Sequence, residues 1–131
     1  MSNSDINRIS NAIRTTLNTY SRQIVEGVEK AADETVKEMV KETKKRPKGR
    51  YSSGLYARSI ASQVGENTIS ARSRIWYVRA PRYRLTHLIN NGHAVRGGGR
   101  YAGDKHVTRA ADRAMTNFET RVREVIENAS N

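Results

Sequence analysis

The chain has 131 residues, a formal net charge of +11 at pH 7 and no cysteine. This length suits a single domain spanning 1–131, and the lack of cysteine excludes a disulfide framework and thiolate chemistry. No apolar run reaches the roughly 18 residues of a membrane span, and the first residues lack the apolar centre of a signal peptide. We therefore expect a cytoplasmic protein that does not enter a membrane.

The positive charge is concentrated in the middle of the chain. Residues 1–41 carry six basic and six acidic side chains, residues 42–109 carry fifteen and three, and residues 110–131 carry three and four. The middle section therefore has a net charge of +12 and is expected to face a negative partner, either nucleic acid or an acidic protein surface.

A long amphipathic helix is predicted in the first third of the chain, over 1–41. From Asp5 to Lys41 apolar residues recur at steps of three or four with no proline. Such a helix spans about 54 Å, which is longer than a small domain. Since Leu, Ile, Val and Phe make up only 24 of 131 residues, we expect a thin core and a helix that partly meets another subunit, through Ile13, Leu17, Tyr20 and Ile24. The alternative is a break at Gly27.

The segment 42–54 is basic, contains Pro47 and Gly49, and is predicted to be a loop or mobile arm. After it, 55–60 suits a helical turn. A hairpin is predicted next, with strands 60–64 and 68–71 on either side of the turn residues Gly65, Glu66 and Asn67. The run IWYV at 75–78 is typical of a buried strand.

Residues 55–109 are predicted to hold the sheet, a short helix and a glycine-rich loop, and 110–131 to form a C-terminal helix. A short helix over 82–90 should stop at the Asn91-Gly92 pair, followed by a glycine-rich loop. The C-terminal helix should begin with Thr108 as its N-cap. The order predicts an α+β domain with a long N-terminal helix, a small, mainly antiparallel sheet, a short helix and a C-terminal helix.

Candidate catalytic and metal-binding groups are sparse. Three histidines, His87, His93 and His106, lie within twenty residues, but their spacing is unlike that of zinc sites and the nearby carboxylate is Asp104 alone. The sequence offers no nucleophile with a base and no carboxylate pair. The glycines after Arg96 match neither of the nucleotide-binding motifs GxxxxGK[ST] and GxGxxG. We expect no enzymatic activity, no metal and no cofactor.

Basic residues in the middle of the chain are interleaved with tyrosine and tryptophan. Nucleic-acid binders combine arginine and aromatic rings in this way, and protein interfaces favour the same residue types. Both interpretations stay open for the candidate partner-binding residues Lys44, Lys45, Arg46, Lys48, Arg50, Arg72, Arg74, Arg79, Arg82 and Arg84.

Residues 83–111, YRLTHLINNGHAVRGGGRYAGDKHVTRAA, resemble the signature of the phage tail-component family typified by gene product ten of the lambdoid phage Hong Kong 97. Members commonly read HLxExGHxxRxGGxxxxxPHxxPA here, and residues 54–60 are similar to the family's Gly-x-Leu-x-x-Ser-Ile. Asn90 and Asn91 depart from the usual acidic and aromatic pair. The matching positions are Gly54, Leu55, Ser59, Ile60, His87, Leu88, Gly92, His93, Arg96, Gly97, Gly98 and His106.

The resemblance implies a structural protein of the phage neck or head-proximal tail end that acts in tail completion or head–tail joining. It implies a ring of six or twelve subunits, other neck or tail proteins as partners, transient contact with phage DNA, and a place in the virion after assembly in the host cytoplasm. The alternative suggested by the charge is a basic DNA-binding accessory protein, and a weaker one is a small toxin-like or RNA-binding protein.

Overall fold

The longest element is a single helix, α1, which covers Asn3–Lys44. The computed structural model describes residues 3–45, 54–67 and 72–129. The predicted long helix is confirmed, and the alternative break at Gly27 is wrong. Gly27 allows a close helix contact instead, because a Cβ built on it would lie 2.5 Å from Cγ1 of Val125.

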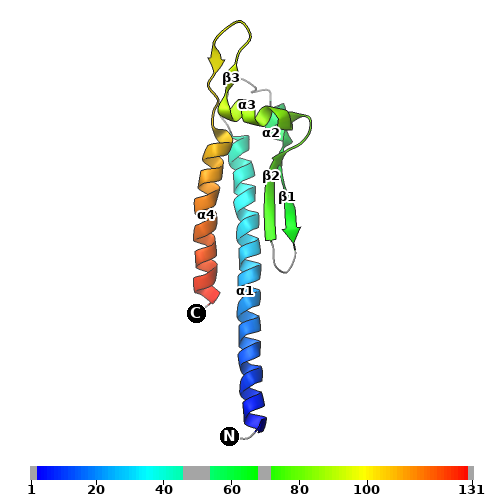
Figure 1. Cartoon of the computed structure of the whole chain (residues 1–131), viewed down its shortest axis with the longest axis vertical. Helices are drawn as coiled ribbons and strands as arrows, with labels where there is room; N and C mark the ends of the chain where they lie inside the picture. Colours follow the sequence, from blue (N-terminus) through cyan, green and yellow to red (C-terminus); the bar gives the residue numbers. More distant parts are fainter. Residues whose placement is uncertain (1–2, 46–53, 68–71, 130–131) are drawn as a thin grey trace.

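The second long helix, α4 (His106–Ala129), lies beside the C-terminal half of α1 and runs in the opposite direction (Figure 1). Arg121 on α4 donates to Oγ1 of Thr35 at 2.8 Å and also pairs with Glu38 on α1. The hydrogen bond to Glu38 raises the pKa of the Arg121 guanidinium. Figure 1 shows the N-terminal half of α1 extending well beyond the end of α4.

An antiparallel hairpin packs on the other side of α1. Its strands are β1 (Ile60–Asn67) and β2 (Arg72–Val78), paired from Ile60 with Val78 to Asn67 with Arg72. A hairpin that begins at Ile60 is confirmed, but its predicted pairing was wrong. Residues 60–64 pair with 74–78 instead of 68–71, and the predicted turn 65–67 belongs to β1, where the register shifts. The predicted strand 68–71 lies outside the described residues.

The largest apolar cluster lies where the hairpin meets the short helices. Tyr56, Ile60, Val78 and Ile89 are buried there, with Val40, Trp76 and Leu85 packed against them. The IWYV run is only partly buried, since Ile75 is 41% exposed and Val78 is 7% exposed. The predicted strand is confirmed, but within the run Val78 is buried and Ile75 is not, because α1 covers one face of the hairpin and alternate side chains point to solvent.

Short elements connect the hairpin to α4. They are α2 (Leu55–Ser59), η1 (Arg82–Leu85), α3 (Thr86–Asn91) and a small antiparallel pair, β3 (His93–Ala94) and β4 (Arg100–Tyr101). The predicted helix 82–90 is thus a 3₁₀ turn followed by α3, and it ends at Gly92, whose φ of 87° confirms the predicted stop. The glycine-rich loop is the tip of the β3–β4 pair (Figure 1).

The α+β class is confirmed, with two separate two-stranded sheets in the part of the chain that the structure describes. Among these residues, no helix is both long and apolar enough to cross a lipid bilayer.

Candidate functional site

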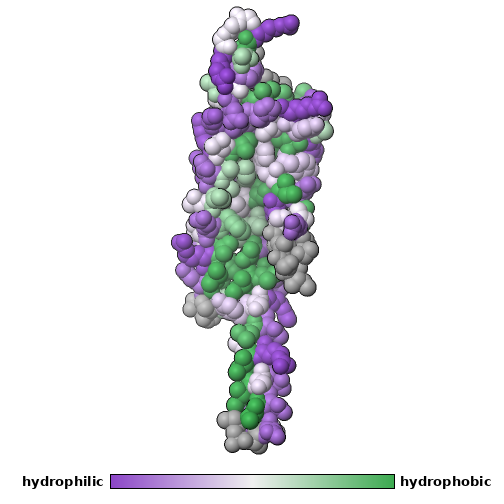
Figure 2. Space-filling model, in the orientation of Figure 1, coloured by the Kyte–Doolittle hydropathy of each residue, from purple (hydrophilic) through white to green (hydrophobic). Residues whose placement is uncertain are grey.

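The most unusual surface of the molecule is an apolar stripe on the N-terminal half of α1. Ile6, Ile9, Ile13 and Leu17 are 48%, 49%, 55% and 59% exposed. Figure 2 shows hydrophobic residues along one side of the part of α1 that extends beyond the other elements. We call these four residues the free stripe. Of the predicted interface residues, Ile13 and Leu17 belong to it, whereas Tyr20 and Ile24 are half-buried.

A second apolar surface is a groove between α1, α4 and β2, with a volume of about 380 Å³. Met115 on its rim is 69% exposed. Figure 2 shows the groove on the same face of the molecule as the free stripe. We call it the apolar groove, and its lining includes Val36, Met39, Trp76, Met115 and Phe118.

The predicted basic residues do not form one patch within the described residues. Lys44 and Lys45 are exposed at the end of α1. Arg46, Lys48 and Arg50 lie outside the described residues, as does the side chain of Arg72.

The arginines of β2 and η1 differ in their surroundings. The Arg74 side chain is only 13% exposed, and its Nε lies 3.6 Å from the Asp33 carboxylate on α1, so it stabilises the packing of the hairpin on that helix. Arg79 and Arg84 are exposed and Arg82 is half-buried. The exposed members of the predicted basic set therefore lie at the end of α1 and around η1.

Asp33 has a lowered pKa. The main cause is the hydrogen bond from Lys37, whose Nζ lies 2.8 Å from the Asp33 carboxylate, and Arg74 lowers the pKa further. The Asp33 side chain is 42% exposed, so solvent weakens both interactions. The Arg74–Asp33 ion pair connects the hairpin to α1.

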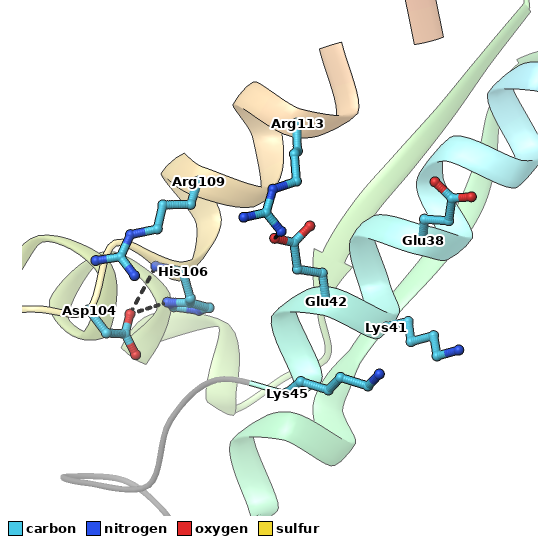
Figure 3. Close-up of a pocket in the computed structure, with 8 residues that line it drawn as sticks. All are labelled: Glu38, Lys41, Glu42, Lys45, Asp104, His106, Arg109 and Arg113. Atoms are coloured by element: carbon cyan, nitrogen blue, oxygen red, sulfur yellow. Dashed lines mark hydrogen bonds and ion pairs between the residues drawn. The ribbon is translucent and has the colours of Figure 1, made fainter. Parts of the chain in front are cut away.

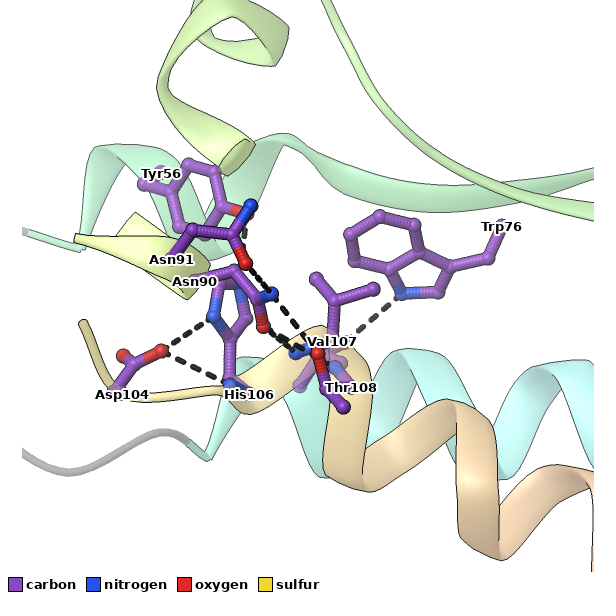
Figure 4. Close-up of polar contacts among 9 residues, drawn as sticks. Tyr56, Trp76, Asn90, Asn91, Asp104, His106, Val107 and Thr108 are labelled. Carbon is purple, nitrogen blue, oxygen red and sulfur yellow. Dashed lines mark hydrogen bonds and ion pairs between the residues drawn. The ribbon is translucent and has the colours of Figure 1, made fainter. Parts of the chain in front are cut away.

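Of the residues of the family-like motif, His106 lies at the junction of α2, α3 and α4 (Figure 4). His106 is the first residue of α4 and lies between Tyr56, on α2, and Asp104. The His106 Nε2 is 2.8 Å from the Tyr56 hydroxyl, and the His106 Nδ1 is 2.6 Å from the Asp104 carboxylate. A carboxylate only accepts, so Nδ1 carries a proton and donates to Asp104, while Nε2 shares a hydrogen bond with the Tyr56 hydroxyl. The buried imidazole therefore joins two elements that are fifty residues apart.

Asn90 caps the start of α4 from outside that helix. Its Oδ1 accepts the backbone N–H groups of Val107 at 2.9 Å and Thr108 at 3.2 Å (Figure 4). The prediction that Thr108 is the N-cap was wrong, because α4 begins at His106 and these two amides are satisfied by Asn90. The departure from the family pattern at this position thus has a defined structural role.

The other motif residues act locally. Gly54 precedes α2 with a φ of 88°, the Ser59 hydroxyl donates to the Leu55 carbonyl at 2.9 Å, and Ile60 is buried. Leu88 is half-buried on α3. Gly97 and Gly98, with the exposed Arg96, form the tip of the β3–β4 pair and have positive φ.

The three histidines do not come together. His87 is exposed on α3, the His93 ring lies 5.5 Å from that of Tyr101, and His106 is buried at the junction. No group of three potential metal ligands occurs among the described residues.

A polar pocket of about 500 Å³ lies between the C-terminal end of α1 and the start of α4 (Figure 3). Basic and acidic side chains alternate around it, and Arg113 pairs with Glu42 across it. Both nitrogens of His106 are already engaged by Asp104 and Tyr56. The Arg113–Glu42 pair thus connects α4 to α1.

The apolar groove and the Tyr56–His106–Asp104 contacts were not predicted from the sequence. Asp104 carried a local signal, since an aspartate just before a helix commonly accepts first-turn amides, and it does accept the His106 N–H at 3.0 Å.

Comparison of the chain with known protein families, curated sequences and solved structures finds no match.

Proposed function

We propose that the protein is a structural ring component of the neck or head-proximal tail end of a tailed bacteriophage, where it acts in tail completion or head–tail joining. The observation that carries the proposal is the free stripe, in which four large apolar side chains lie about half exposed on a helix that extends beyond its own domain.

An exposed apolar band of this length costs free energy in water and marks an interaction surface. Covering it requires another chain, and a closed ring of identical subunits covers every copy equally. The motif resemblance around residues 83–111 supports the phage assignment and a ring of six or twelve subunits. On this proposal the protein works without catalysis, metal or cofactor, assembles in the host cytoplasm and ends in the virion.

The test is the mass of the purified protein in solution, alone and mixed with isolated tails, measured by mass photometry and followed by electron microscopy. We expect a discrete oligomer of six or twelve subunits, either alone or at the tail end. A protein that stays monomeric and does not bind tails would contradict the proposal.

A second candidate function is DNA binding, favoured by the net charge of +12 in residues 42–109. One observation and one physical argument weigh against it. Arg74 is paired within the chain, and a conduit ring that gripped many phosphates would hold back the passing DNA. The partner of the exposed basic residues is therefore proposed to be an acidic face of a neighbouring neck or tail protein.

A salt titration separates the two functions. Binding of a fluorescent DNA duplex, followed by anisotropy, should be weak at about 0.15 M salt, with a Kd of roughly 10⁻⁴ to 10⁻⁶ M, and should fade as salt rises. Replacing Lys44, Lys45, Arg46, Lys48 and Arg50 by Gln should impair tail attachment more than DNA affinity. Nanomolar, sequence-dependent binding at that salt would favour the DNA-binding function.

A further inference from the structure

We infer that the apolar groove is the acceptor for the free stripe of a second copy of this chain, so that neighbouring subunits join head to tail. The inference rests on the proposed ring function and names the surface that completes it. It follows from the fact that one chain carries both surfaces and leaves both uncovered (Figure 2).

The free stripe cannot reach the groove of its own chain. Both surfaces include residues of the same unbroken helix, and the nearest of them, Leu17 and Ala32, are fifteen residues apart, or about 22 Å along the axis. A continuous helix does not fold back on itself. The contact must therefore be made between two copies.

The two surfaces match in size and chemistry. The stripe from Ile6 to Leu17 is about 16 Å long, and the α1 side of the groove, from Ala32 to Met39, is about 10 Å long. Two or three branched side chains of the stripe fill such a groove. Met115 and Met39 adapt their shape to an incoming side chain more readily than branched residues do.

Charges beside the two surfaces are complementary. At 100° per residue, Arg14 lies about 60° around α1 from Leu17, and Asp112 and Glu119 lie one turn to either side of Met115. All three charged side chains are exposed and form no ion pair with another described residue. A docked helix would place Arg14 near one of the two carboxylates.

The contact joins different surfaces on the two partners, so it repeats. Each subunit offers its stripe to one neighbour and its groove to the other, which generates a ring when the rotation closes. The docking geometry then sets the number of subunits.

Disulfide trapping tests this contact cleanly because the native chain has no cysteine. Full-length chains carrying Leu17→Cys are mixed with chains carrying Met115→Cys under mild oxidation. We expect one cross-linked dimer on a non-reducing gel, and a ladder of higher species from the chain that carries both substitutions.

Thr15→Cys is the matched control, since residue 15 is exposed on the opposite side of the same helix turn. It should cross-link to Met115→Cys at least five-fold less. Equal cross-linking of the two, preferential pairing of Leu17→Cys chains with each other, or a double variant that stops at the dimer would overturn the head-to-tail contact. Circular dichroism confirms that each variant is folded.

A charge reversal supplies an independent readout. Arg14→Glu should lower the yield of the 17–115 cross-link several-fold, and Asp112→Arg with Glu119→Arg in the partner chain should restore it. Oligomers that form normally without any 17–115 cross-link would refute this contact while leaving the ring function intact. A protein that stays monomeric with and without tails would refute both.

Discussion

The two halves of α1 have the same periodicity but different surroundings. In the C-terminal half, Ala31 and Val36 are 3% and 8% exposed under α4 and the hairpin, whereas in the N-terminal half Ile13 and Leu17 are 55% and 59% exposed. Periodicity therefore predicts that a helix has an apolar face, and it does not say whether the covering element belongs to the same chain.

Side-chain size distinguishes the halves. The covered half presents small residues to α4, namely Gly27, Ala31 and Thr35, which let the two helix backbones approach closely. The free half presents isoleucine and leucine at the corresponding positions of the stripe. Large branched side chains are those that insert between the residues of a partner element, which agrees with the proposed contact between subunits.

The largest expected effects come from two aspartate variants, one at a buried position of the covered half and one at two positions of the free stripe. Val36→Asp should unfold the protein, because burying an unpaired charge costs several kcal/mol, a large part of the stability of a small domain. Ile13→Asp with Leu17→Asp should leave the melting temperature unchanged and abolish assembly and tail joining. Thermal melts followed by circular dichroism, together with mass photometry, measure both. Normal assembly by the double variant would show that the free stripe is not an interface.

The next effect concerns Gly27, where the covered half begins. Gly27→Leu should destabilise the monomer by roughly 1 to 3 kcal/mol, because the new side chain would overlap Val125 on α4. Thr15→Leu, on an exposed position of the free half, is the control and should have little effect. Urea unfolding measures the difference. Equal midpoints for the two variants would mean that α4 does not pack closely on α1 at this point.

A smaller effect is expected at the junction of α3 and α4. Asn90→Ala removes the acceptor for the Val107 and Thr108 amides and should cost about 0.5 to 2 kcal/mol, as the loss of a helix cap does. His87→Ala, at an exposed position of α3, is the control. Hydrogen exchange at the two amides should quicken in the first variant only, and unchanged protection there would exclude the capping role.

Most of the secondary structure was predictable because its signals are local. The steps of three or four in α1 and α4, and the Asn91-Gly92 stop of α3, depend on neighbouring residues only. The hairpin turn was misplaced because Gly65 and Glu66 look like turn residues. In the structure they continue β1, and the Glu66 N–H donates to the Ser73 hydroxyl at 2.7 Å across the irregular pairing.

The site was less predictable because it depends on contacts between distant segments. Asn90 caps a helix that begins sixteen residues later, and no local pattern indicates this. The apolar groove combines α1, β2 and α4, so its existence depends on the tertiary arrangement. In contrast, the free stripe was predictable from helix length alone.

The smallest expected effect is a pH dependence confined to the covered half of α1. The pKa of Asp33 is lowered by Lys37 and Arg74, so the folded state favours the ionised carboxylate. This contribution to stability is present above the ordinary pKa of an aspartate, near 4, and is lost as pH falls through the lower pKa of the folded state. Asp33→Asn should therefore flatten the fall in melting temperature below about pH 4, and added salt should shrink the difference because the pair is partly exposed. Glu26→Gln, at an exposed position of α1, is the control. An identical acid profile for the Asp33→Asn variant and the native protein would show that the ionised Asp33 carboxylate adds no stability to the fold.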